Sequence, residues 1–327
     1  MEDVAAEAGV SRALVSLVMR GSPNVSDERR RRVLDAAERL QYRPNAMARG
    51  LASARTRTIG VLLNDLDNPF FADIAAGIEA LASELGYQLL LGTGRRVPAR
   101  EQTAVAAFGD YRVDGLILVS PRLDEAALAA AARRTPTVVL GRELAAPDLD
   151  TLGVDERMGV RAVVNYLAGL GHADILHVTG GDGAGAATRE AAFKAEMAAA
   201  GLGPGRVLAG DFTEDSGVRA AQTLLTRGPL PTAVFAANDL IAAGMMDTFL
   251  RAGLRIPEDL SLVGYDNIYI AGLRQISLTT VDQPRATMGR QALELLLERI
   301  EGRAERVERL VEPTLIVRDT AGRAPKR

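Results

Sequence analysis

The pattern of apolar residues near the N-terminus predicts two short helices separated by a tight turn. Gly9 stands directly after the first apolar group, at the position where a glycine commonly ends a helix. Ser11 then offers a side chain that can cap the start of a second helix. The apolar sides, both at helical spacing, consist of Val4, Ala5 and Ala8 in the first helix and Leu14, Val15 and Val18 in the second.

A third helix is predicted to follow, with Ser26 as its cap and Asp27 and Glu28 in its first turn, where the helix dipole favours negative charge. Its apolar side is predicted to consist of Val33, Leu34, Ala37 and Leu40. Two short helices joined by a glycine turn and crossed by a third describe a helix-turn-helix domain, assigned here to residues 1–43. Other small three-helix bundles need similar apolar spacing, so the pattern alone leaves that alternative open.

The second predicted helix presents a polar side that is suited to reading DNA. In a helix-turn-helix this helix enters the major groove, where exposed residues near its start meet the base edges. Arg12 can donate two hydrogen bonds to a guanine, whereas Leu17 offers only apolar contact, for instance to a thymine methyl group. The candidate DNA-contacting residues here are Ser11, Arg12, Ala13, Ser16, Leu17 and Arg20.

Residues 44–57 are predicted to form a hinge between the head and the rest of the chain. The segment begins at Pro44 and carries alanines and one apolar edge, but Gly50 and its short length make it marginal as an isolated helix. A segment that folds only against a partner or DNA has this character. A plain linker is the alternative interpretation.

From residue 58 onward, apolar runs of strand length alternate with helical patterns. Residues 71–85 are a predicted helix, and the predicted strands are 59–63, 87–91, 115–119, 137–140, 175–178, 207–209, 233–236 and 260–263. Valine, isoleucine and leucine runs separated by helices are typical of a parallel sheet that is covered on both faces. Because the alternation repeats on either side of residue 155, we expect two similar lobes. The fold class is therefore α/β, an all-α head followed by a two-lobed, doubly wound parallel-sheet core.

Polar and aromatic side chains follow the strands of this predicted core at their carboxyl ends, where open parallel sheets bind ligands. Amides, carboxylates and guanidinium groups flanked by phenylalanines are suited to a polyhydroxylated ring, because aromatic faces cover its C–H side. Each residue alone also has an ordinary explanation as a cap, turn or surface charge. The candidate effector-binding residues are Asn68, Phe70, Phe71, Arg142, Arg189, Phe212, Asn238, Asp266 and Gln283.

Charge and composition narrow the function classes. Residues 1–57 contain eleven arginines and seven acidic residues, while the whole chain carries a net charge of −3, so a basic head is attached to an acidic body. The chain has no cysteine, and its two histidines, His172 and His177, flank a predicted helix-to-strand turn, so no metal site is expected. There is neither an apolar run of membrane-spanning length nor a basic segment leading into an export signal. These features predict a soluble, cytoplasmic protein without membrane contact.

An enzyme is disfavoured by the absence of its motifs. The glycine run 180–185 lies between a strand and a helix, as a phosphate-binding loop would, yet the chain has neither a Gly-x-Gly-x-x-Gly motif nor a Walker lysine. No Ser/His/Asp set stands out either. We therefore interpret the run as a crossover loop and expect neither catalysis nor a cofactor.

The head resembles that of the lactose-repressor (LacI/GalR) family. The matching motifs are Asp3-Val4-Ala5, Ala8-Gly9-Val10-Ser11, Val15-Ser16, Val25-Ser26, Tyr42-Arg43-Pro44-Asn45 and Ala48-Arg49-Gly50-Leu51-Ala52. The resemblance implies that the hinge becomes a helix on the operator and that Leu51 wedges into the minor groove, with Asn45 and Arg49 as further DNA contacts. Three positions depart from the family, since Leu14, Leu17 and Arg20 stand where threonine, arginine and asparagine are usual.

The core resembles the effector-binding core of the same family and of ribose-type sugar-binding proteins. The motifs are Asn68-Pro69-Phe70-Phe71, Arg189 four residues before Phe193, Ala237-Asn238-Asp239, Gly264-Tyr265-Asp266 and Gln283-Pro284. Gly141 departs from the aspartate that often precedes Arg142, and Ala192 from the usual glycine. The first departure removes an acceptor for a ligand hydroxyl and bears on the identity of the sugar.

We therefore expect a transcriptional regulator, most simply a repressor, whose homodimer binds a palindromic operator in double-stranded DNA under the control of a sugar-like effector. No heptad tail follows residue 318, which favours a dimer over a tetramer. The solute-binding protein of a sugar transporter is the alternative, although such a protein has no use for the head. The expected domains are the head, the hinge and an effector-binding core at 58–320, with lobe 1 near 58–154 and 285–310, lobe 2 near 155–284 and 311–320, and a tail at 321–327.

Overall fold

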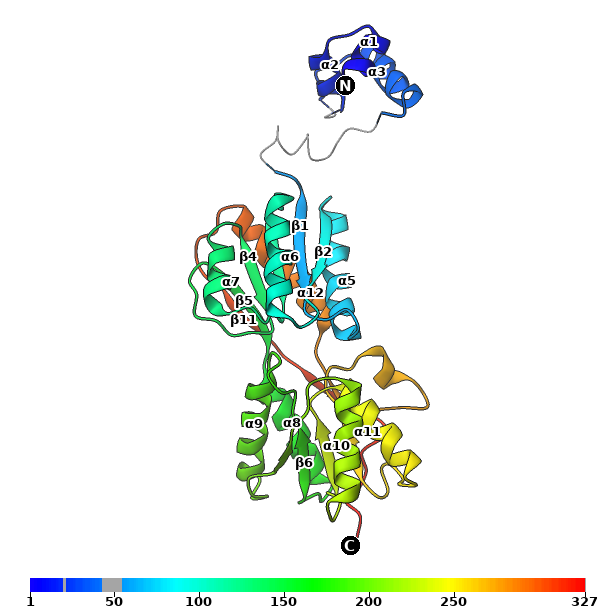
Figure 1. Cartoon of the computed structure of the whole chain (residues 1–327), viewed down its shortest axis with the longest axis vertical. Coiled ribbons are helices and arrows are strands. Elements are labelled where there is room, and N and C mark those ends of the chain that lie inside the picture. Colours follow the sequence, from blue (N-terminus) through cyan, green and yellow to red (C-terminus); the bar gives the residue numbers. More distant parts are fainter. Residues whose placement is uncertain (20–21, 43–54, 327) are drawn as a thin grey trace. The chain divides into compact units, whose positions relative to one another are not determined.

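The computed structural model describes residues 1–19, 22–42 and 55–326, and it divides into two compact units at Arg57 (Figure 1). The first unit, Met1–Arg57, holds the helices α1 (Glu2–Ala8), α2 (Arg12–Met19) and α3 (Asp27–Arg39). The second unit, Thr58–Arg327, holds the mixed α/β core.

The head follows the predicted helices with small corrections. Gly9 ends α1 in the left-handed conformation at φ 62°, and the Ser11 hydroxyl accepts a hydrogen bond from the Leu14 backbone N–H at 3.2 Å, so both predicted caps are confirmed. Ser26 holds the cap position of α3, but its side chain makes no capping hydrogen bond. The predicted core side of α3 is wrong at two positions: Leu34 and Leu40 are exposed, and Ala36 joins Val33 and Ala37 in the core..

The first lobe of the core is built on a six-stranded sheet in the order β11-β5-β4-β3-β1-β2, with parallel pairing throughout. Its strands are β1 (Thr58–Leu63), β2 (Gln88–Thr93), β3 (Gly115–Val119), β4 (Thr137–Leu140), β5 (Asp150–Val154) and β11 (Glu308–Val311). Alternate residues of β1 face opposite ways. Ile59, Val61 and Leu63 pack under α5 (Pro69–Glu84) and α12 (Arg285–Ile300), while Leu62 packs under α6 (Pro98–Asp110) and α7 (Glu125–Ala132).

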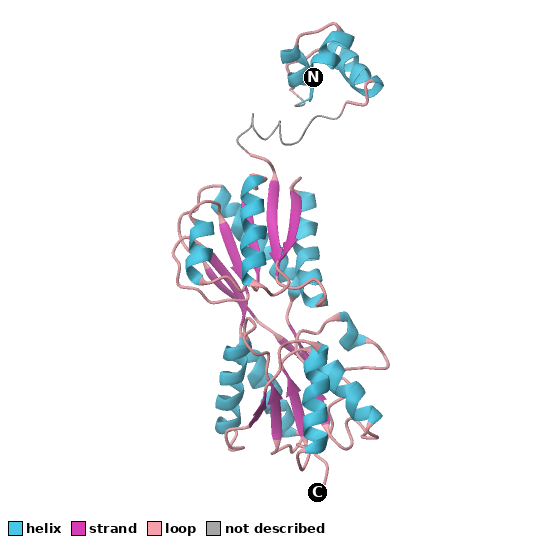
Figure 2. Ribbon diagram, viewed as in Figure 1, coloured by secondary structure: helices cyan, strands magenta, loops and turns pink. Residues whose placement is uncertain are grey.

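The second lobe has a smaller parallel sheet in the order β7-β6-β8-β9 (Figure 2). Its strands are β6 (Ile175–Val178), β7 (Arg206–Leu208), β8 (Ala233–Ala236) and β9 (Ser261–Val263). One face is covered by α10 (Glu214–Thr226) and α11 (Asp239–Arg251), and the other by α8 (Glu156–Gly169) and α9 (Ala186–Ala199). A short 3-10 turn, η1 (Tyr269–Gly272), precedes the antiparallel pair β10 (Thr280–Asp282) and β12 (Thr314–Ile316). This is the two-lobed, doubly wound architecture that the alternation of patterns predicted.

The chain passes between the lobes three times, after β5, after β10 and after β11. The buried carboxylate of Asp150, on β5, binds the segment that leads from α12 to β11. It accepts hydrogen bonds from Arg299 at 2.9 Å, from Arg303 at 2.5 Å and from the Val307 N–H at 2.8 Å. Burial opposes its ionisation, but these hydrogen bonds outweigh burial and lower the pKa of Asp150. The cluster ties α12 and the approach to β11 onto β5.

Helices α5 and α12 cross at glycines, and this contact gives a testable prediction. A Cβ on Gly77 would overlap the backbone carbonyl of Ala286, so Gly77→Ala is expected to destabilise the core by about 1–3 kcal/mol through overpacking. Gly109 in α6 has open space around it, and Gly109→Ala should be neutral or slightly stabilising. Urea unfolding of both variants measures the difference, and equal midpoints would contradict the close crossing.

Among the residues that the structure describes, no helix combines the length and the apolar character that crossing a membrane requires.

Candidate functional site

A cavity of about 610 Å³ lies between the two lobes of the core. Both lobes line it, from the loops after β1, β3 and β4 on one side and the loops before α9, α11 and α12 on the other. All nine residues proposed from the sequence line this one cavity: Asn68, Phe70, Phe71, Arg142, Arg189, Phe212, Asn238, Asp266 and Gln283. The structure thus brings together side chains that are up to about two hundred residues apart along the chain.

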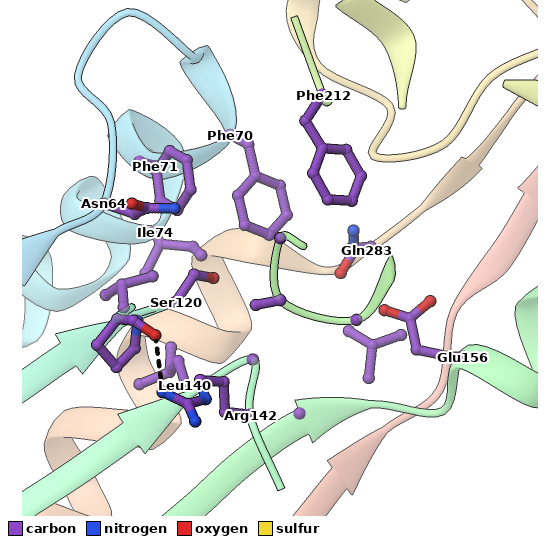
Figure 3. A pocket seen from close by; sticks show the side chains of 18 of the residues that line it. Asn64, Phe70, Phe71, Ile74, Ser120, Leu140, Arg142, Glu156, Phe212 and Gln283 are labelled. Atoms are coloured by element: carbon purple, nitrogen blue, oxygen red, sulfur yellow. Dashed lines mark hydrogen bonds between the residues drawn. The ribbon is translucent and has the colours of Figure 1, made fainter. Parts of the chain in front are cut away.

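The first-lobe wall is shaped by the start of α5. Asn68 is the N-cap, and its Oδ1 accepts a hydrogen bond from the Phe70 N–H at 3.0 Å. Pro69 follows at the first helical position, where its missing N–H costs nothing. This cap aims Phe70 and Phe71 toward the cavity, and their rings meet edge to face with centroids 5.3 Å apart (Figure 3).

Arg142, after β4, braces the loop that follows β3. Its guanidinium donates to the carbonyls of Pro121 at 3.0 Å and Leu123 at 2.5 Å. The buried Glu101 also holds this loop, because its carboxylate accepts hydrogen bonds from the backbone N–H groups of Arg122 and Leu123. Burial raises the pKa of Glu101, against the lowering effect of these hydrogen bonds. Arg142 is therefore a lining residue whose polar group is largely used within the protein.

Arg189 lies on the first turn of α9 and is the most enclosed cation of the cavity. Its guanidinium forms a two-pronged ion pair with Glu156, with Nε to Oε2 at 2.9 Å and Nη2 to Oε1 at 2.8 Å, and its Nη1 donates to the Ala237 carbonyl. It also lies 3.6 Å from the ring centroid of Tyr265. Burial opposes its charge, but the Glu156 carboxylate outweighs burial and raises the pKa of Arg189.

Phe212 approaches the cavity from the second lobe, opposite Phe70 (Figure 3). Its backbone is left-handed at φ 65°, an uncommon conformation for a residue with a side chain. The ring packs on Gly180 and Gly183, where a Cβ on either glycine would overlap it. The Asn238 side chain donates to the Phe212 carbonyl at 3.1 Å and accepts from the Ile241 N–H as the cap of α11. The glycine run thus forms the surface on which the Phe212 ring packs.

Asp266 and Gln283 are buried residues that line the cavity on the side of the second lobe. The Gln283 Nε2 donates to the Asp266 Oδ1 at 2.5 Å, and Arg285 donates to the Asp266 carbonyl and, at 2.7 Å, to that of Asn267. Burial raises the pKa of Asp266 to about 7, although the charges of Arg189 and Arg285 act in the opposite direction.

Several lining residues escaped the sequence analysis. Glu156, Asn64 and Ser120 all border the cavity. Asn64 and Ser120 directly follow β1 and β3, so the strand-end rule that found the other residues applies to them as well. Glu156 opens α8, where it has the ordinary look of an acidic first-turn residue, and only the three-dimensional contact with Arg189 marks it.

On the head, the candidate DNA-contacting side of α2 is open to solvent where the structure describes it. Arg12, Ala13 and Leu17 are exposed, and Ser16 is half-buried. Arg12 makes a surface ion pair with Glu2 at 3.3 Å, an interaction that DNA can readily displace. Ser11 is exposed and serves as the cap of α2. The other predicted contacts lie outside the described residues: Arg20, Asn45, Arg49 and Leu51.

The histidines have structural surroundings. His177 is buried between Phe235 and Phe193, and its Nδ1 is 2.9 Å from the Phe235 carbonyl oxygen. Burial lowers the pKa of His177 to about 3, so the ring is neutral at physiological pH. Within the described residues no group of three or more histidine or acidic side chains is arranged to hold a metal ion.

Comparison with known proteins assigns the chain. Residues 1–45 match the model for bacterial regulatory proteins of the lacI family, and residues 164–321 match that for a periplasmic binding protein-like domain. The HTH-type transcriptional repressor CytR of Escherichia coli (strain K12) is 34% identical over 331 residues, which cover 99% of this chain and 97% of CytR. The chain belongs to the lacI family of bacterial regulatory proteins.

Two solved structures support the fold of this lacI-family regulator. The lac repressor dimer bound to operator and the anti-inducer ONPF superimposes with a TM-score of 0.89 at 30% identity, covering 98% of each chain. The complex of the transcriptional regulator CelR with cellobiose gives a TM-score of 0.75 at 34% identity, again covering 98% of each chain. The lacI-family regulator is thus a DNA-binding transcriptional regulator and not an enzyme, and the predicted family and fold class are confirmed.

Proposed function

We propose that this lacI-family regulator binds a palindromic operator as a homodimer and that an effector in the cavity between its core lobes sets its affinity for that operator. The observation that carries the proposal is the joint presence, in one chain, of an exposed α2 surface with Arg12 and a polar and aromatic cavity in the core. The lac repressor dimer on its operator, which has the same fold, supports the pairing of two heads on DNA. This function places the protein with the chromosome in the cytoplasm.

The cavity composition favours a sugar or sugar derivative. Phe70 and Phe212 offer aromatic faces from opposite lobes (Figure 3), while Asp266 and Gln283 offer hydrogen-bonding groups. The CelR complex shows that a relative of the same fold holds cellobiose. A thermal-shift screen of sugars and polyols tests this point, because a ligand that binds only the folded protein must raise its melting temperature. A screen without any response from neutral or charged sugars would contradict a sugar effector.

Lobe closure is the proposed route from effector to operator. A ligand that bridges both walls of the cavity stabilises one closure of the lobes, which in the dimer favours or disfavours the hinge segments on DNA. The coupling is reciprocal, so operator binding must change effector affinity by the same factor. For the hinge contacts Asn45, Arg49 and Leu51, the proposal rests on the family resemblance. For Arg20 it rests on the helical spacing that puts this residue on the polar side of the second predicted helix, together with Arg12.

Arg12 gives the sharpest test of the DNA surface. Arg12→Ala is expected to weaken binding to the specific operator by about 1–3 kcal/mol while changing affinity for random duplex much less, because a base-edge contact is lost. Arg31→Ala on α3 removes the same charge from an exposed site outside α2 and serves as the control. Gel-shift titrations at two salt concentrations measure both terms. Equal losses on operator and random DNA for Arg12→Ala would show that Arg12 contacts phosphate and does not read a base.

A further inference from the structure

The charged side chains around the cavity are nearly balanced. The described lining residues include the arginines Arg96, Arg122, Arg142, Arg189 and Arg309 and the acids Asp65, Glu143, Glu156, Asp182, Asp266 and Glu308. With all of them ionised, the lining carries one more negative than positive charge. A site that binds an anionic ligand group instead needs guanidinium or backbone donors that are free to receive it.

Four of these five guanidinium groups are already engaged within the protein. Arg122 forms a two-pronged ion pair with Asp182 at 2.7 and 3.0 Å, and Arg96 donates to the Asp211 carbonyl at 2.5 Å. Arg142 donates to two carbonyls, as described above. The fifth, Arg309, is half-buried on β11. The cavity therefore presents its cations largely neutralised or bonded.

Glu156 is the central acid of this arrangement. It is the first residue of α8, and its carboxylate accepts two hydrogen bonds from the Arg189 guanidinium, at 2.8 and 2.9 Å, in a bidentate ion pair. The pair is enclosed, because the side chain of Arg189 is 3% exposed and that of Glu156 13%. An ion pair sheltered in this way is screened little by solvent.

The same carboxylate also lies at the N-terminus of α9. Gly185 is the N-cap of that helix in the left-handed conformation, and a Cβ placed on it would lie 2.7 Å from the Glu156 Oε1. A helix N-terminus attracts negative charge through its unpaired N–H groups and its dipole. Glu156 thus lies at both features of the cavity that would best hold a ligand phosphate or carboxylate, the buried guanidinium and the helix end.

The polar groups of the cavity that are open to a ligand are hydrogen-bond acceptors, which an anionic group would not satisfy. The Asn64 Oδ1 borders the cavity, is buried and has no hydrogen-bond partner in the described structure, and the Asp266 carboxylate lies on the far wall. A buried acceptor without a partner is costly unless a ligand supplies a donor. Hydroxyl groups are such donors, and phosphate and carboxylate groups at neutral pH are not.

We propose that Glu156 is a built-in counter-ion that restricts the effector to uncharged polyhydroxylated molecules and excludes phosphorylated or carboxylated ones. The inference rests on the proposed function in that it takes the cavity to be the effector site. Glu156 acts by occupying the guanidinium of Arg189 and by adding its own negative charge, so it determines specificity through Arg189. A purely structural ion pair would instead stabilise the fold without influencing which charge the cavity accepts.

Inorganic sulfate is a probe that separates these two roles without knowledge of the effector. Equilibrium dialysis of the full-length protein at low ionic strength compares the wild type with Glu156→Gln, which keeps the size of the side chain and removes its charge. We expect Glu156→Gln to bind sulfate at least about tenfold more tightly than the wild type, because a buried guanidinium and a helix N-terminus become available together.

Asp182→Asn is the matched control. It also removes one negative charge from the lining and frees an arginine, but Asp182 is 79% exposed and belongs to the outer pair with Arg122. Its sulfate affinity should stay within about threefold of the wild type, because an exposed charge is screened. Either of two results would overturn the proposal. An unchanged sulfate affinity in Glu156→Gln would mean that the ion pair is purely structural, and an equal gain in both variants would mean that only the net charge of the cavity matters.

A second measurement needs no substitution and therefore does not depend on whether Glu156→Gln folds. The melting temperature of the wild type is followed with matched probes, D-glucose against D-glucuronate and D-ribose against D-ribose 5-phosphate. We expect any stabilisation to come from the neutral member of a pair, and a larger shift with the anionic member would overturn the proposal. A lack of response to all four probes together with a sulfate gain in Glu156→Gln would count against a sugar effector and support the role of Glu156.

Discussion

Replacing Arg189 with alanine is expected to abolish the effector response and to lower the free energy of unfolding by about 3–5 kcal/mol, because Glu156 would be left without its partner in a largely buried site. The substitution also removes the cation that lies against Tyr265 and the donor to the Ala237 carbonyl. Denaturant unfolding measures the stability, and operator release by whichever sugar the thermal-shift screen identifies measures the response.

Arg122→Ala is the matched comparison for the stability measurement. Arg122 also makes a two-pronged ion pair across the cavity, but its partner Asp182 is exposed and is resolvated easily when the arginine is lost. We therefore expect Arg122→Ala to cost about 1 kcal/mol or less. Similar losses for the two variants would show that the Arg189–Glu156 pair is no more sheltered than the outer pair. A normal operator response in Arg189→Ala would contradict the placement of the effector.

The sequence was sufficient for the layout of the core because parallel sheets leave a simple signature. The strands at 115–119, 137–140, 175–178 and 233–236 match β3, β4, β6 and β8 residue for residue, since each is buried on both faces and reads as a short apolar run. The carboxyl ends of such strands share an edge of their sheet. Polar residues just after them could therefore be expected to meet, and the nine candidates do line one cavity.

The strands that the sequence analysis missed have a physical explanation. β5 begins with Asp150, a charge that pattern analysis assigns to the surface, and contains Gly153. Asp150 is nevertheless fully buried, because Arg299 and Arg303 neutralise it from about 150 residues further along the chain. β11 was missed because its alternate residues Glu308 and Leu310 are exposed, as expected for an edge strand.

In the head, the pattern of apolar residues also could not predict which face of α3 is buried. Leu34 and Leu40 fit the helical period of α3 as well as Ala36 does, yet the structure exposes both leucines and buries the alanine. The neighbouring helices α1 and α2 are short and meet α3 through small residues such as Ala5 and Ala8, which bring the backbones close together. Small contact residues select the face in this case, and hydrophobicity alone does not.

Phe212 and Glu156 show why the cavity chemistry needed the structure. The glycine run 180–185 was interpreted as a crossover loop, but Gly180 and Gly183 form the seat of the Phe212 ring. Nothing in the local sequence links this run to a phenylalanine about thirty residues later. In the same way, Glu156 becomes part of the cavity only through its ion pair with Arg189, thirty-three residues away.

Asp266→Asn is expected to become more stable relative to the wild type as the pH rises from 5 to 8, with a change of about 2–3 kcal/mol in the difference between their unfolding free energies. Burial raises the pKa of Asp266 to about 7, from an ordinary value of 3.8. At pH 5 the folded protein therefore holds a proton on this carboxyl that the unfolded chain has already released. Raising the pH toward 7 then destabilises the wild type, at about 1.36 kcal/mol for each unit below the folded pKa.

The asparagine variant has no proton to lose at this position, so the pH dependence of the difference isolates Asp266 from groups that titrate alike in both proteins. The charged groups that act on it are Arg189, Arg285 and Glu156, together with Asp239, whose own pKa is raised by burial and by Asp266. Urea unfolding of both proteins at pH 5, 6, 7 and 8 gives the difference directly. A difference that stays constant over this range would mean that Asp266 is ionised in the folded protein throughout and is stabilised by Arg189 and Arg285 more strongly than burial opposes it.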